Sequence, residues 1–436
     1  MRFHYSSAHR SHLRVVLRLR FLLIAALIGL AGCNFRTAAP SDAPTGVTAT
    51  PGDGLILMSW DPLPDLTYWI FFTAGGSVTN AVPGSTVIRD ATNPQVVGRL
   101  TNGTQYAFIM NATHFDSPAG PNSTVVVATP RLAGGTNPDS TSTWVSGPAI
   151  APQNLKGIAF NGSRFVVVGD NATIFAGDFN YANATPPGVT AWMPANAPLP
   201  VTANLTGVVV SGGYLAMGTD GSTLTSPDGL TWTQAAQIPG TGMNDIAVGT
   251  PGGSTTFVAV GNGGAIFNST NPTVQWNAAQ PTTPASTSDL FSVSFLNGQF
   301  VATGANGTLL TSFDGNTWTV QNSNTTSALR GAAFGTVATG PTAGPLYVVV
   351  GDAGTIATSP DGAGWTRITP LAQNLNGVVF GSRFVAVGQG GVVAYSDDGV
   401  NWKSTTSGGS SDLARVLFPP GMYLAIGAAG ANAVSR

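Results

Sequence analysis

The 436-residue sequence has no glutamate and few side chains that could act as a catalyst. Its 19 acidic residues are all aspartates, it has one cysteine, and only one of its four histidines, His114, lies beyond position 12. Residues 140–436 contain neither histidine nor cysteine, so Ser-His-Asp and Cys-His mechanisms lack their base there. A histidine-ligated metal site is excluded from the same segment. A single cysteine cannot form a disulfide within the chain.

Charge of either sign is scarce as well. Charged residues make up 8% of the chain, whereas glycine occurs 56 times. Five of the 17 basic residues precede position 33, so the remainder has 12 basic residues against 19 acidic ones, a net charge of 12 − 19 = −7. No basic stripe is present, and nucleic acid is therefore not an expected partner. This composition is typical of short strands joined by tight turns, and no segment after position 33 has helical periodicity.

The N-terminal segment has the layout of a secretory signal peptide. Five arginines precede an apolar run, FLLIAALIGLA, at residues 21–31. The run is shorter than the roughly 20 apolar residues that span a bilayer. Small residues follow it, as they do at a signal cleavage site. We therefore expect residues 1–32 to be removed from the mature protein.

The apolar run ends in Leu30-Ala31-Gly32-Cys33, and Cys33 is the single cysteine of the chain. This pattern resembles the lipobox of bacterial lipoproteins, which implies cleavage before Cys33 and acylation of its thiol. Asn34 follows in place of aspartate, which in Gram-negative lipoproteins implies sorting to the outer membrane. An ordinary signal peptide beside an isolated cysteine is the alternative. With the lipid anchor, residues 33–43 form a tether to the bacterial cell envelope, facing either the periplasm or the medium.

Residues 44–131 alternate between apolar and polar positions in the manner of a β-sandwich. The apolar faces of two expected strands carry Ile56, Met58 and Trp60, and Tyr68, Ile70 and Phe72. Because Trp60, Pro62, Leu100 and Tyr106 follow one another in order, the segment resembles a fibronectin type III domain with a tyrosine corner. No Arg-Gly-Asp loop is present, so we expect this domain to be a spacer, with residues 132–139 as a linker.

Residues 140–436 consist of a repeated unit. Each unit runs Leu-x-x-Val-x-Phe, a glycine turn, Phe-Val-Ala-Val-Gly, a tight loop, Ile-x-Thr-Ser and then Asp-Gly-x-x-Trp. The units start at Leu155, Leu205, Met243, Leu290, Leu329, Leu375 and Leu413, which are 38 to 50 residues apart. That spacing matches one four-stranded blade per unit. The sequence therefore predicts an all-β protein whose second domain is a seven-bladed β-propeller.

The two ends of this segment complement each other. The last unit ends at Arg436 without a Trp strand, whereas Ser140-Thr-Ser-Thr-Trp144 stands before the first complete unit. A strand at Trp144 could complete the last blade from the other end of the segment. Such a closure would remove the exposed edge of that sheet.

Four units carry the motif Ser-x-Asp-Gly-x-x-Trp, which resembles the Asp-box of bacterial neuraminidase repeats. The resemblance implies a turn between the third and the outer strand, where the aspartate accepts backbone N–H groups and glycine supplies a positive φ. The motif residues are Ser226, Asp228 and Trp232; Ser312, Asp314 and Trp318; Ser359, Asp361 and Trp365; and Ser396, Asp398 and Trp402. Residues 269–276 lack both the aspartate and the glycine. We therefore interpret the motif as structural.

Proteins with such repeats include sialidases, tandem-propeller endoglucanases, sortilin-like receptors and the photosystem II assembly factor, so the resemblance alone assigns no function. Sialidases need a Tyr–Glu pair and three converging arginines. Glutamate is absent, and Arg164 and Arg383 occupy the same position of two different units, which indicates a feature of the repeat. Sialidase activity is not expected.

A glycosidase that uses two aspartates is harder to exclude, because two carboxyl groups suffice. Asp170, Asp220 and Asp352 lie in the tight loops after the second strand, which in a propeller surround one mouth of the central channel. They are candidates to face a cation or a sugar. Aspartate also favours tight turns for structural reasons alone.

We therefore expect a non-enzymatic, lipid-anchored scaffold without metal or cofactor, whose propeller binds an envelope protein or an extracellular glycan. A glycoside hydrolase that uses an aspartate pair is one alternative. An assembly factor similar to the photosystem II protein is another, and it rests on repeat similarity alone.

Overall fold

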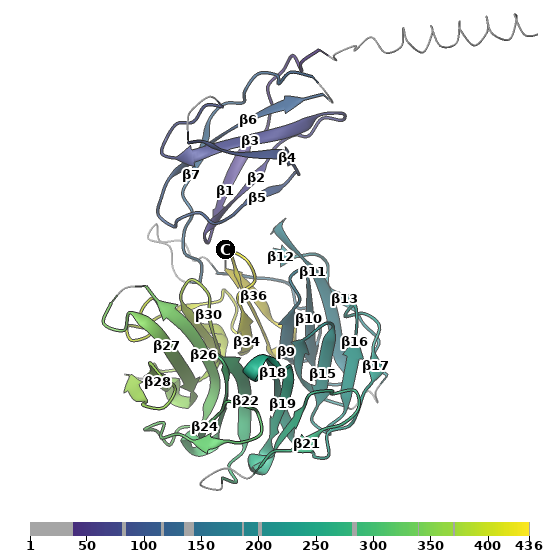
Figure 1. Cartoon of the computed structure of the whole chain (residues 1–436), viewed down its shortest axis with the longest axis vertical. Coiled ribbons are helices and arrows are strands. Elements are labelled where there is room, and N and C mark those ends of the chain that lie inside the picture. The colour runs from purple at the N-terminus through teal and green to yellow at the C-terminus, as the bar shows by residue number, and fades with distance from the viewer. Residues whose placement is uncertain are drawn as a thin grey trace, which may run out of the picture. The chain divides into compact units, whose positions relative to one another are not determined.

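The computed structural model describes residues 38–80, 84–114, 117–134, 144–184, 187–198, 203–280, 286–338, 340–368 and 371–435. The expected signal peptide and Cys33 lie outside these residues. Within the described ranges, the helices are six single 3-10 turns, and no helix is long and apolar enough to cross a membrane. The remaining regular structure consists of β-strands (Figure 1).

The chain divides into two compact units. The first contains the described residues up to Thr48 together with Ser59–Gln95 and Tyr106–Val127, and the second contains Ala49–Met58, Val96–Gln105 and Ala128–Arg436. The boundary is therefore crossed several times along the chain, whereas the sequence predicts one boundary near residue 132.

The first unit is formed by one four-stranded sheet with the order β4-β3-β6-β7. Its strands are β3 (Thr67–Ala74), β4 (Thr86–Ala91), β6 (Tyr106–Thr113) and β7 (Val126–Ala128). Tyr68 and Ile70 are buried at alternate positions of β3, as the sequence pattern predicts, while Phe72 is half-buried. The ring of Trp60 packs 5.2 Å from that of Tyr68. Alternation of this kind gives a sheet one apolar face.

The second unit begins with a three-stranded sheet with the order β1-β2-β5. Its strands are β1 (Thr48–Gly52), β2 (Leu55–Ser59) and β5 (Gln95–Val97). Ile56 and Met58 alternate along β2 and are fully buried. The turn before β2 is held by Asn102, whose side chain accepts the Gly54 N–H (2.9 Å) and donates to Asp53 (2.7 Å).

Seven antiparallel sheets follow in the described residues from 144 onward, and we number them 1 to 7 in the order of their innermost strands (Figure 1). The innermost strands are β9 (Leu155–Phe160), β14 (Leu205–Val210), β18 (Met243–Gly249), β22 (Leu290–Leu296), β26 (Leu329–Val337), β30 (Leu375–Phe380) and β34 (Leu413–Leu417). The second strands are β10 (Arg164–Gly169), β15 (Tyr214–Gly218), β19 (Thr256–Gly261), β23 (Gln299–Gly304), β27 (Gly344–Gly351), β31 (Phe384–Gly388) and β35 (Tyr423–Gly427).

The third strands are β11 (Thr173–Ala184), β16 (Thr223–Ser226), β20 (Ile266–Ser269), β24 (Leu309–Ser312), β28 (Ile356–Ser359), β32 (Val392–Ser396) and β36 (Asn432–Ser435). The outer strands are β13 (Met193–Pro194), β17 (Thr233–Gln234), β21 (Asn277–Ala278), β25 (Thr319–Val320), β29 (Thr366–Ile368), β33 (Lys403–Thr406) and β8 (Trp144–Ser146). Strand β12 (Pro187–Val189) extends sheet 1 beside β11. The 3-10 turns are η1 (Pro251–Gly253), η2 (Asn262–Gly264), η3 (Ala305–Gly307), η4 (Asp352–Gly354), η5 (Gln389–Gly391) and η6 (Ala428–Gly430).

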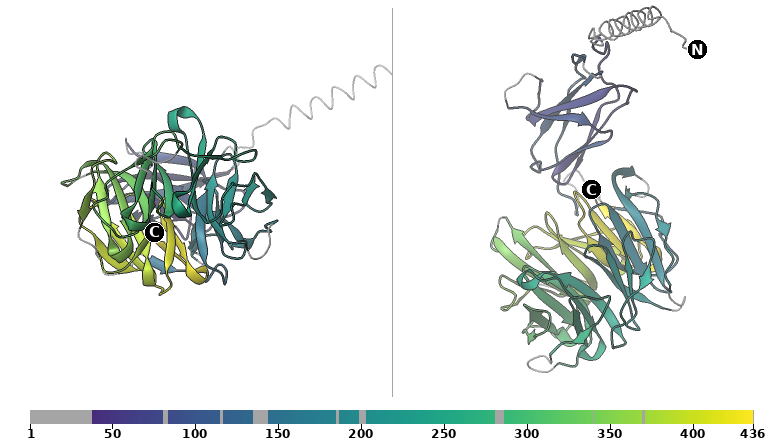
Figure 2. Two further views of the ribbon diagram at one scale, coloured as in Figure 1. Left: turned by 90° about the horizontal axis from the view of Figure 1, so that it is seen from below. Right: turned by 45° about the vertical axis from the view of Figure 1, so that its right-hand side comes forward.

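The sheets form a closed ring, which Figure 2 shows from two further sides. Each innermost strand contacts the innermost strand of the next sheet, and β34 contacts β9. Strand β8 pairs antiparallel with β36, with Trp144 opposite Ser435. Sheet 7 therefore takes its outer strand from the segment that precedes sheet 1. A ring of radially arranged four-stranded sheets is the architecture of a β-propeller.

Aromatic residues fill the gaps between successive sheets. In sheet 4, Phe295 lies 4.8 Å from Phe300, and Phe300 lies 6.4 Å from Trp318, measured between ring centroids. Trp318 is 1% exposed and belongs to an apolar cluster that also contains Val258 and Val260 of sheet 3. Burial of such large rings supplies much of the stabilising free energy of a β-sheet protein. The repeated tryptophan thus packs one sheet against its neighbour.

A glycine at the end of the second strand is required for steric reasons. A Cβ atom on Gly304 would lie 2.1 Å from the carbonyl oxygen of Asp289. That close approach brings the tight loop onto the start of the innermost strand, where the Ala305 N–H donates to the same carbonyl at 2.8 Å. Any larger residue would push the loop and the strand apart.

Candidate functional site

The four Ser-x-Asp-Gly turns are held by their own side chains. In the turn of sheet 2, Asp228 Oδ1 accepts the backbone N–H groups of Leu230 (2.9 Å) and Thr231 (2.8 Å). Ser226 Oγ donates to Asp228 Oδ1 (3.1 Å) and accepts the Gly229 N–H (2.8 Å). Trp232 Nε1 donates to the Gly229 carbonyl at 3.0 Å. Every polar group of the motif therefore has a partner within the turn.

The other three turns repeat this arrangement. The aspartate oxygen accepts two backbone N–H groups in each, and the tryptophan Nε1 donates to the glycine carbonyl at 3.2, 3.1 and 2.9 Å. The backbone N–H bonds from Thr231 and Leu230 lower the pKa of Asp228 to about 2. Backbone N–H bonds from Ala363 and Gly364 likewise lower the pKa of Asp361. Burial opposes the same shift at Asp314 and Asp398, but hydrogen bonds outweigh it and lower both pKa values. These carboxylates hold turns together.

The aspartates of the tight loops, Asp170, Asp220 and Asp352, make their contacts within their own sheets. Lys156 Nζ lies 2.5 Å from Asp170 Oδ1, and Arg330 pairs with both carboxylate oxygens of Asp352. Asp220 is exposed and accepts the Ser222 N–H at 3.0 Å. Lys156 and Arg330 are the second residues of their innermost strands. Two of the three candidate carboxylates thus tie a loop to the strand beside it.

Arg164 and Arg383 also pair locally. Arg164 binds Asp178 through Nε (2.6 Å) and Nη2 (3.2 Å), and Arg383 Nη2 lies 2.8 Å from Asp397. The hydrogen bond from Arg164 lowers the pKa of Asp178. Arg164 Nη1 also donates to the Asp228 carbonyl in the turn of sheet 2 (2.8 Å), so it joins two sheets. The two arginines lie in sheets 1 and 6, and each pairs with an aspartate of its own sheet.

The repeat contains a link between sheets that the sequence reasoning missed. The Asn or Asp immediately before an innermost strand accepts a backbone N–H from the tight loop of the preceding sheet, at 2.7 to 3.1 Å. The pairs, written donor to acceptor, are Asn171 to Asn204, Gly263 to Asp289, Ala353 to Asn374, Gly390 to Asp412, and Ala429 to Asn154. The signal was present as a recurring Asn or Asp before the first leucine of the unit. These side chains join neighbouring sheets around one mouth of the ring.

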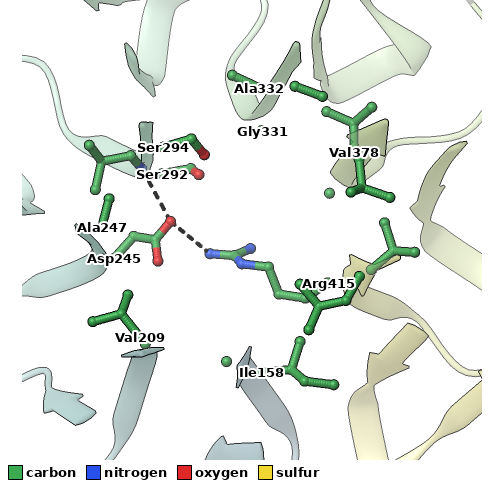
Figure 3. A pocket seen from close by; sticks show the side chains of 18 of the residues that line it. Ile158, Val209, Asp245, Ala247, Ser292, Ser294, Gly331, Ala332, Val378 and Arg415 are labelled. Carbon is green, nitrogen blue, oxygen red and sulfur yellow. Dashed lines mark hydrogen bonds and ion pairs between the residues drawn. The ribbon is translucent and has the colours of Figure 1, made fainter. Parts of the chain in front are cut away.

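The innermost strands of all seven sheets enclose a central cavity of about 460 Å³. Its wall is largely apolar, with Ile158, Val209, Ala332 and Val378 projecting into it (Figure 3). One ion pair crosses it, because Arg415 Nη2 of sheet 7 lies 3.3 Å from Asp245 Oδ2 of sheet 3. Asp245 and Arg415 are the third residues of their innermost strands. Neither residue is among the site residues predicted from the sequence.

A second cavity of about 490 Å³ lies between sheets 2 and 3, at the end of the ring that carries the Ser-x-Asp-Gly turns. Its walls include Tyr214, Pro227 and Thr270–Thr273. In sheets 2 and 4, the glycine of the turn packs against the preceding sheet, since a Cβ on Gly315 would lie 2.9 Å from Val258. The turn of sheet 3 has no such glycine, and a groove remains in its place.

Two further features bear on ligand binding in the described part of the chain, namely clusters of metal-ligating side chains and aromatic rings. No group of three or more histidine, cysteine, aspartate or glutamate side chains is placed there to hold a metal ion. Tyr181, a possible platform for a sugar ring, is 4% exposed and packs in an apolar cluster. Phe291, the other possible platform, lies under the guanidinium of Arg330 at 5.2 Å. The Tyr181 ring is therefore buried, and the guanidinium of Arg330 covers one face of the Phe291 ring.

Comparison with known proteins identifies the fold. No protein-family model and no curated protein matches the chain. The solved structure of YCF48 bound to a D1 peptide matches with a TM-score of 0.53 and 19% sequence identity, over 69% of this chain and 98% of its own. YCF48 from Cyanidioschyzon merolae matches with a TM-score of 0.50 and 18% identity, over 67% and 98% of the two chains. At this identity the likeness shows the fold, a β-propeller.

Proposed function

We propose that the protein is a non-enzymatic scaffold of the bacterial cell envelope that binds a polypeptide partner through its propeller. In this proposal Cys33 carries a lipid anchor in the outer membrane. Residues 44–131 form a fibronectin type III spacer, and residues 140–436 form a seven-bladed propeller with Asp-box turns.

The observation that carries the non-enzymatic part is the engagement of the carboxylates. A glycosidase needs one carboxyl group that can lose a proton and another that can donate one. Asp170 and Asp352 instead pair with Lys156 and Arg330, and the turn aspartates accept backbone N–H groups. This use of the carboxylates does not support the glycoside hydrolase alternative.

A polypeptide partner is supported by the fold neighbour that was solved with a D1 peptide, since it is a protein of the same architecture with a bound peptide. It is also supported by two large apolar side chains, Val274 (66% exposed) and Phe313 (75% exposed). Both belong to turns between the third and the outer strand, in sheets 3 and 4. Gln280, which follows the outer strand of sheet 3, donates to Asn316 in the turn of sheet 4 (3.0 Å), so sheet 3 contacts the turn that carries Phe313.

These two side chains and the groove between sheets 2 and 3 form the surface to which we assign the partner. The residues that line the groove include Thr225, Thr233, Thr270 and Thr273 together with Tyr214 and Phe257. Hydroxyl groups can pair with the backbone of an extended segment, and exposed apolar residues can cover its side chains. A glycan is the remaining alternative for the same surface.

Site-specific photo-crosslinking in the intact envelope tests this function. A photoreactive phenylalanine analogue replaces Phe313 or Val274, and a matched chain carries it at Ser404, an exposed position of β33 in sheet 6. We expect one defined polypeptide adduct from positions 313 and 274 and none from 404. Equal adducts from all three positions, or none from 313 and 274, would contradict the proposal. Binding on a glycan array without any adduct would favour the glycan alternative.

A further inference from the structure

The central cavity contains a polar belt at one level of a largely apolar wall, which Ser294, Arg330 and Asn376 also line. At the third position of the innermost strand, four of the seven sheets have glycine, and the other three have Asp245, Ser292 and Arg415. The glycines let neighbouring strands approach closely, since a Cβ on Gly377 would lie 2.9 Å from the Ala414 carbonyl. The three polar side chains lie around the space that these strands enclose (Figure 3).

The two charged side chains of the belt, Asp245 and Arg415, differ in how completely they are hydrogen-bonded. Asp245 accepts the backbone N–H of Ile246 at 3.0 Å through Oδ1 and that of Val293 at 3.1 Å through Oδ2, and it is 8% exposed. Its carboxylate is therefore held in place without the arginine. Arg415 has five N–H donors. Its ion pairs and hydrogen bonds with described residues are one to Asp245 and one to the carbonyl of Ala414, both at 3.3 Å.

Ser292 supplies a second, independent observation. Its side chain lines the cavity and the residue is 7% exposed. Its hydroxyl makes no hydrogen bond with any residue in the described ranges of the chain, and its oxygen is accessible from the cavity. A hydroxyl group without a partner and an incompletely paired guanidinium thus lie around the same cavity.

We propose that this cavity binds a small organic carboxylate. Its carboxylate accepts hydrogen bonds from Arg415 and Ser292, and its apolar body lies along Val209, Ala332 and Val378. A cationic ligand is disfavoured because it would have to lie beside Arg415, while Asp245 already accepts two backbone N–H groups. A volume of about 460 Å³ is within the range of cavities that hold small molecules. This site is distinct from the polypeptide surface at Val274 and Phe313.

Isothermal titration calorimetry of the full-length protein in a non-ionic detergent, with hexanoate as the probe, tests the proposal. Hexanamide has the same size without the charge and controls for uptake by micelles. We expect saturable binding of hexanoate and none of hexanamide. Arg415→Gln should weaken hexanoate binding by roughly tenfold or more, because a charge-assisted pair is lost. Ser292→Ala should weaken it by a smaller factor. Arg367→Gln, which removes the same charge from the outer strand of sheet 5, should leave it unchanged.

Thermal denaturation shows whether the Arg415→Gln variant folds. If it does not fold, Asp245→Asn provides a second test of the proposal. Asparagine removes the negative charge that competes for Arg415, so hexanoate should bind more tightly to this variant than to the wild type. Unchanged or weaker binding to Asp245→Asn would overturn the proposal. The absence of saturable hexanoate binding to the wild type at millimolar concentrations would overturn it as well. Failure here leaves the crosslinking result at position 313 unaffected, because the two sites are separate.

Discussion

The side chain of Asn154 accepts a hydrogen bond from the backbone N–H of Ala429, 275 residues further along the chain, at 3.0 Å. This bond joins the first innermost strand to the tight loop of sheet 7. Together with the pairing of β8 and β36, it closes the ring. Four equivalent bonds join other pairs of neighbouring sheets. The last and first sheets are therefore joined by the same type of hydrogen bond as the other pairs.

Removal of this link should lower the free energy of unfolding. Asn154→Ala should destabilise the protein by about 1 kcal/mol, the usual value of one hydrogen bond, and by somewhat more because Asn154 also donates to Asp170. Chemical denaturation followed by tryptophan fluorescence measures the change. Gln234→Ala, at an exposed position of β17, is the matched control and should have no effect. Equal stability of the two variants would show that the link does not contribute.

The Ser-x-Asp-Gly turns predict a loss of stability in acid. A carboxyl group whose pKa is lower in the folded than in the unfolded protein stabilises the fold above its unfolded pKa, near 3.9. That stabilisation is lost as the pH falls towards the folded pKa, which is about 2 for Asp228. The free energy of unfolding should therefore decrease between about pH 4 and pH 2.

Asp228→Asn should make this decrease shallower, because one of the titrating groups has been removed while an acceptor oxygen remains. Denaturant unfolding at a series of pH values measures the slope. In the turn of sheet 3 an asparagine, Asn271, occupies the corresponding region, so Asn271→Ala should leave the slope unchanged. A slope in Asp228→Asn equal to that of the wild type would mean that the turn carboxylate does not titrate in this range.

Two buried tyrosines should ionise late. Burial raises the pKa of both Tyr214 and Tyr423 to about 12. Tyr214 Oη donates to the Arg164 carbonyl at 2.8 Å and Tyr423 Oη donates to the Arg383 carbonyl at 2.9 Å. Because the neutral form is favoured in the fold, stability should fall as the pH rises above about 10. In a titration of absorbance at 295 nm, Tyr214→Phe should remove one late-ionising group. Loss of an early group instead would contradict the account.

Because the repeated tryptophan packs neighbouring sheets together, substitution of Trp318 should strongly lower the free energy of unfolding. Its side chain is 1% exposed and its Nε1 donates to the Gly315 carbonyl. Trp318→Ala should destabilise the protein by about 3 to 5 kcal/mol, the usual cost of removing a buried tryptophan. Trp318→Phe retains most of the apolar surface and should cost less. Calorimetric melting temperatures provide the comparison, and equal losses for Ala and Phe would argue against packing as the cause.

The engagement of the loop carboxylates predicts that they do not catalyse glycoside hydrolysis. The triple variant with Asp170→Asn, Asp220→Asn and Asp352→Asn should show the same absence of reducing-sugar release as the wild type on a panel of polysaccharides. The variant should be less stable, because the pairs with Lys156 and Arg330 are weakened. Sugar release by the wild type that disappears in the variant would establish the glycoside hydrolase alternative.

The fold was more accessible from the sequence than the candidate site. Strand order follows from the repeat, because one glycine-rich loop and one Ser-x-Asp-Gly turn recur at fixed places in most units. The partnership of Asp245 with Arg415 was not accessible, since it joins sheets 3 and 7 across the cavity and depends on closure of the ring. The pair of Lys156 with Asp170 could have been predicted, because Arg330 and Asp352 occupy the same two positions of another unit. The groove beside Thr270–Thr273 reflects a missing glycine, and its size depends on side-chain packing.

The measurement that tests the binding function most directly is the affinity of the polypeptide captured from position 313. Calorimetric titration compares the wild type with the double variant Val274→Ser and Phe313→Ser, and with Ser404→Ala as the control. We predict saturable binding to the wild type and the control and a loss of roughly tenfold or more in the double variant, because two large apolar side chains no longer cover the partner. Equal affinity for all three proteins would contradict the assignment of this surface and of a polypeptide-binding function to it.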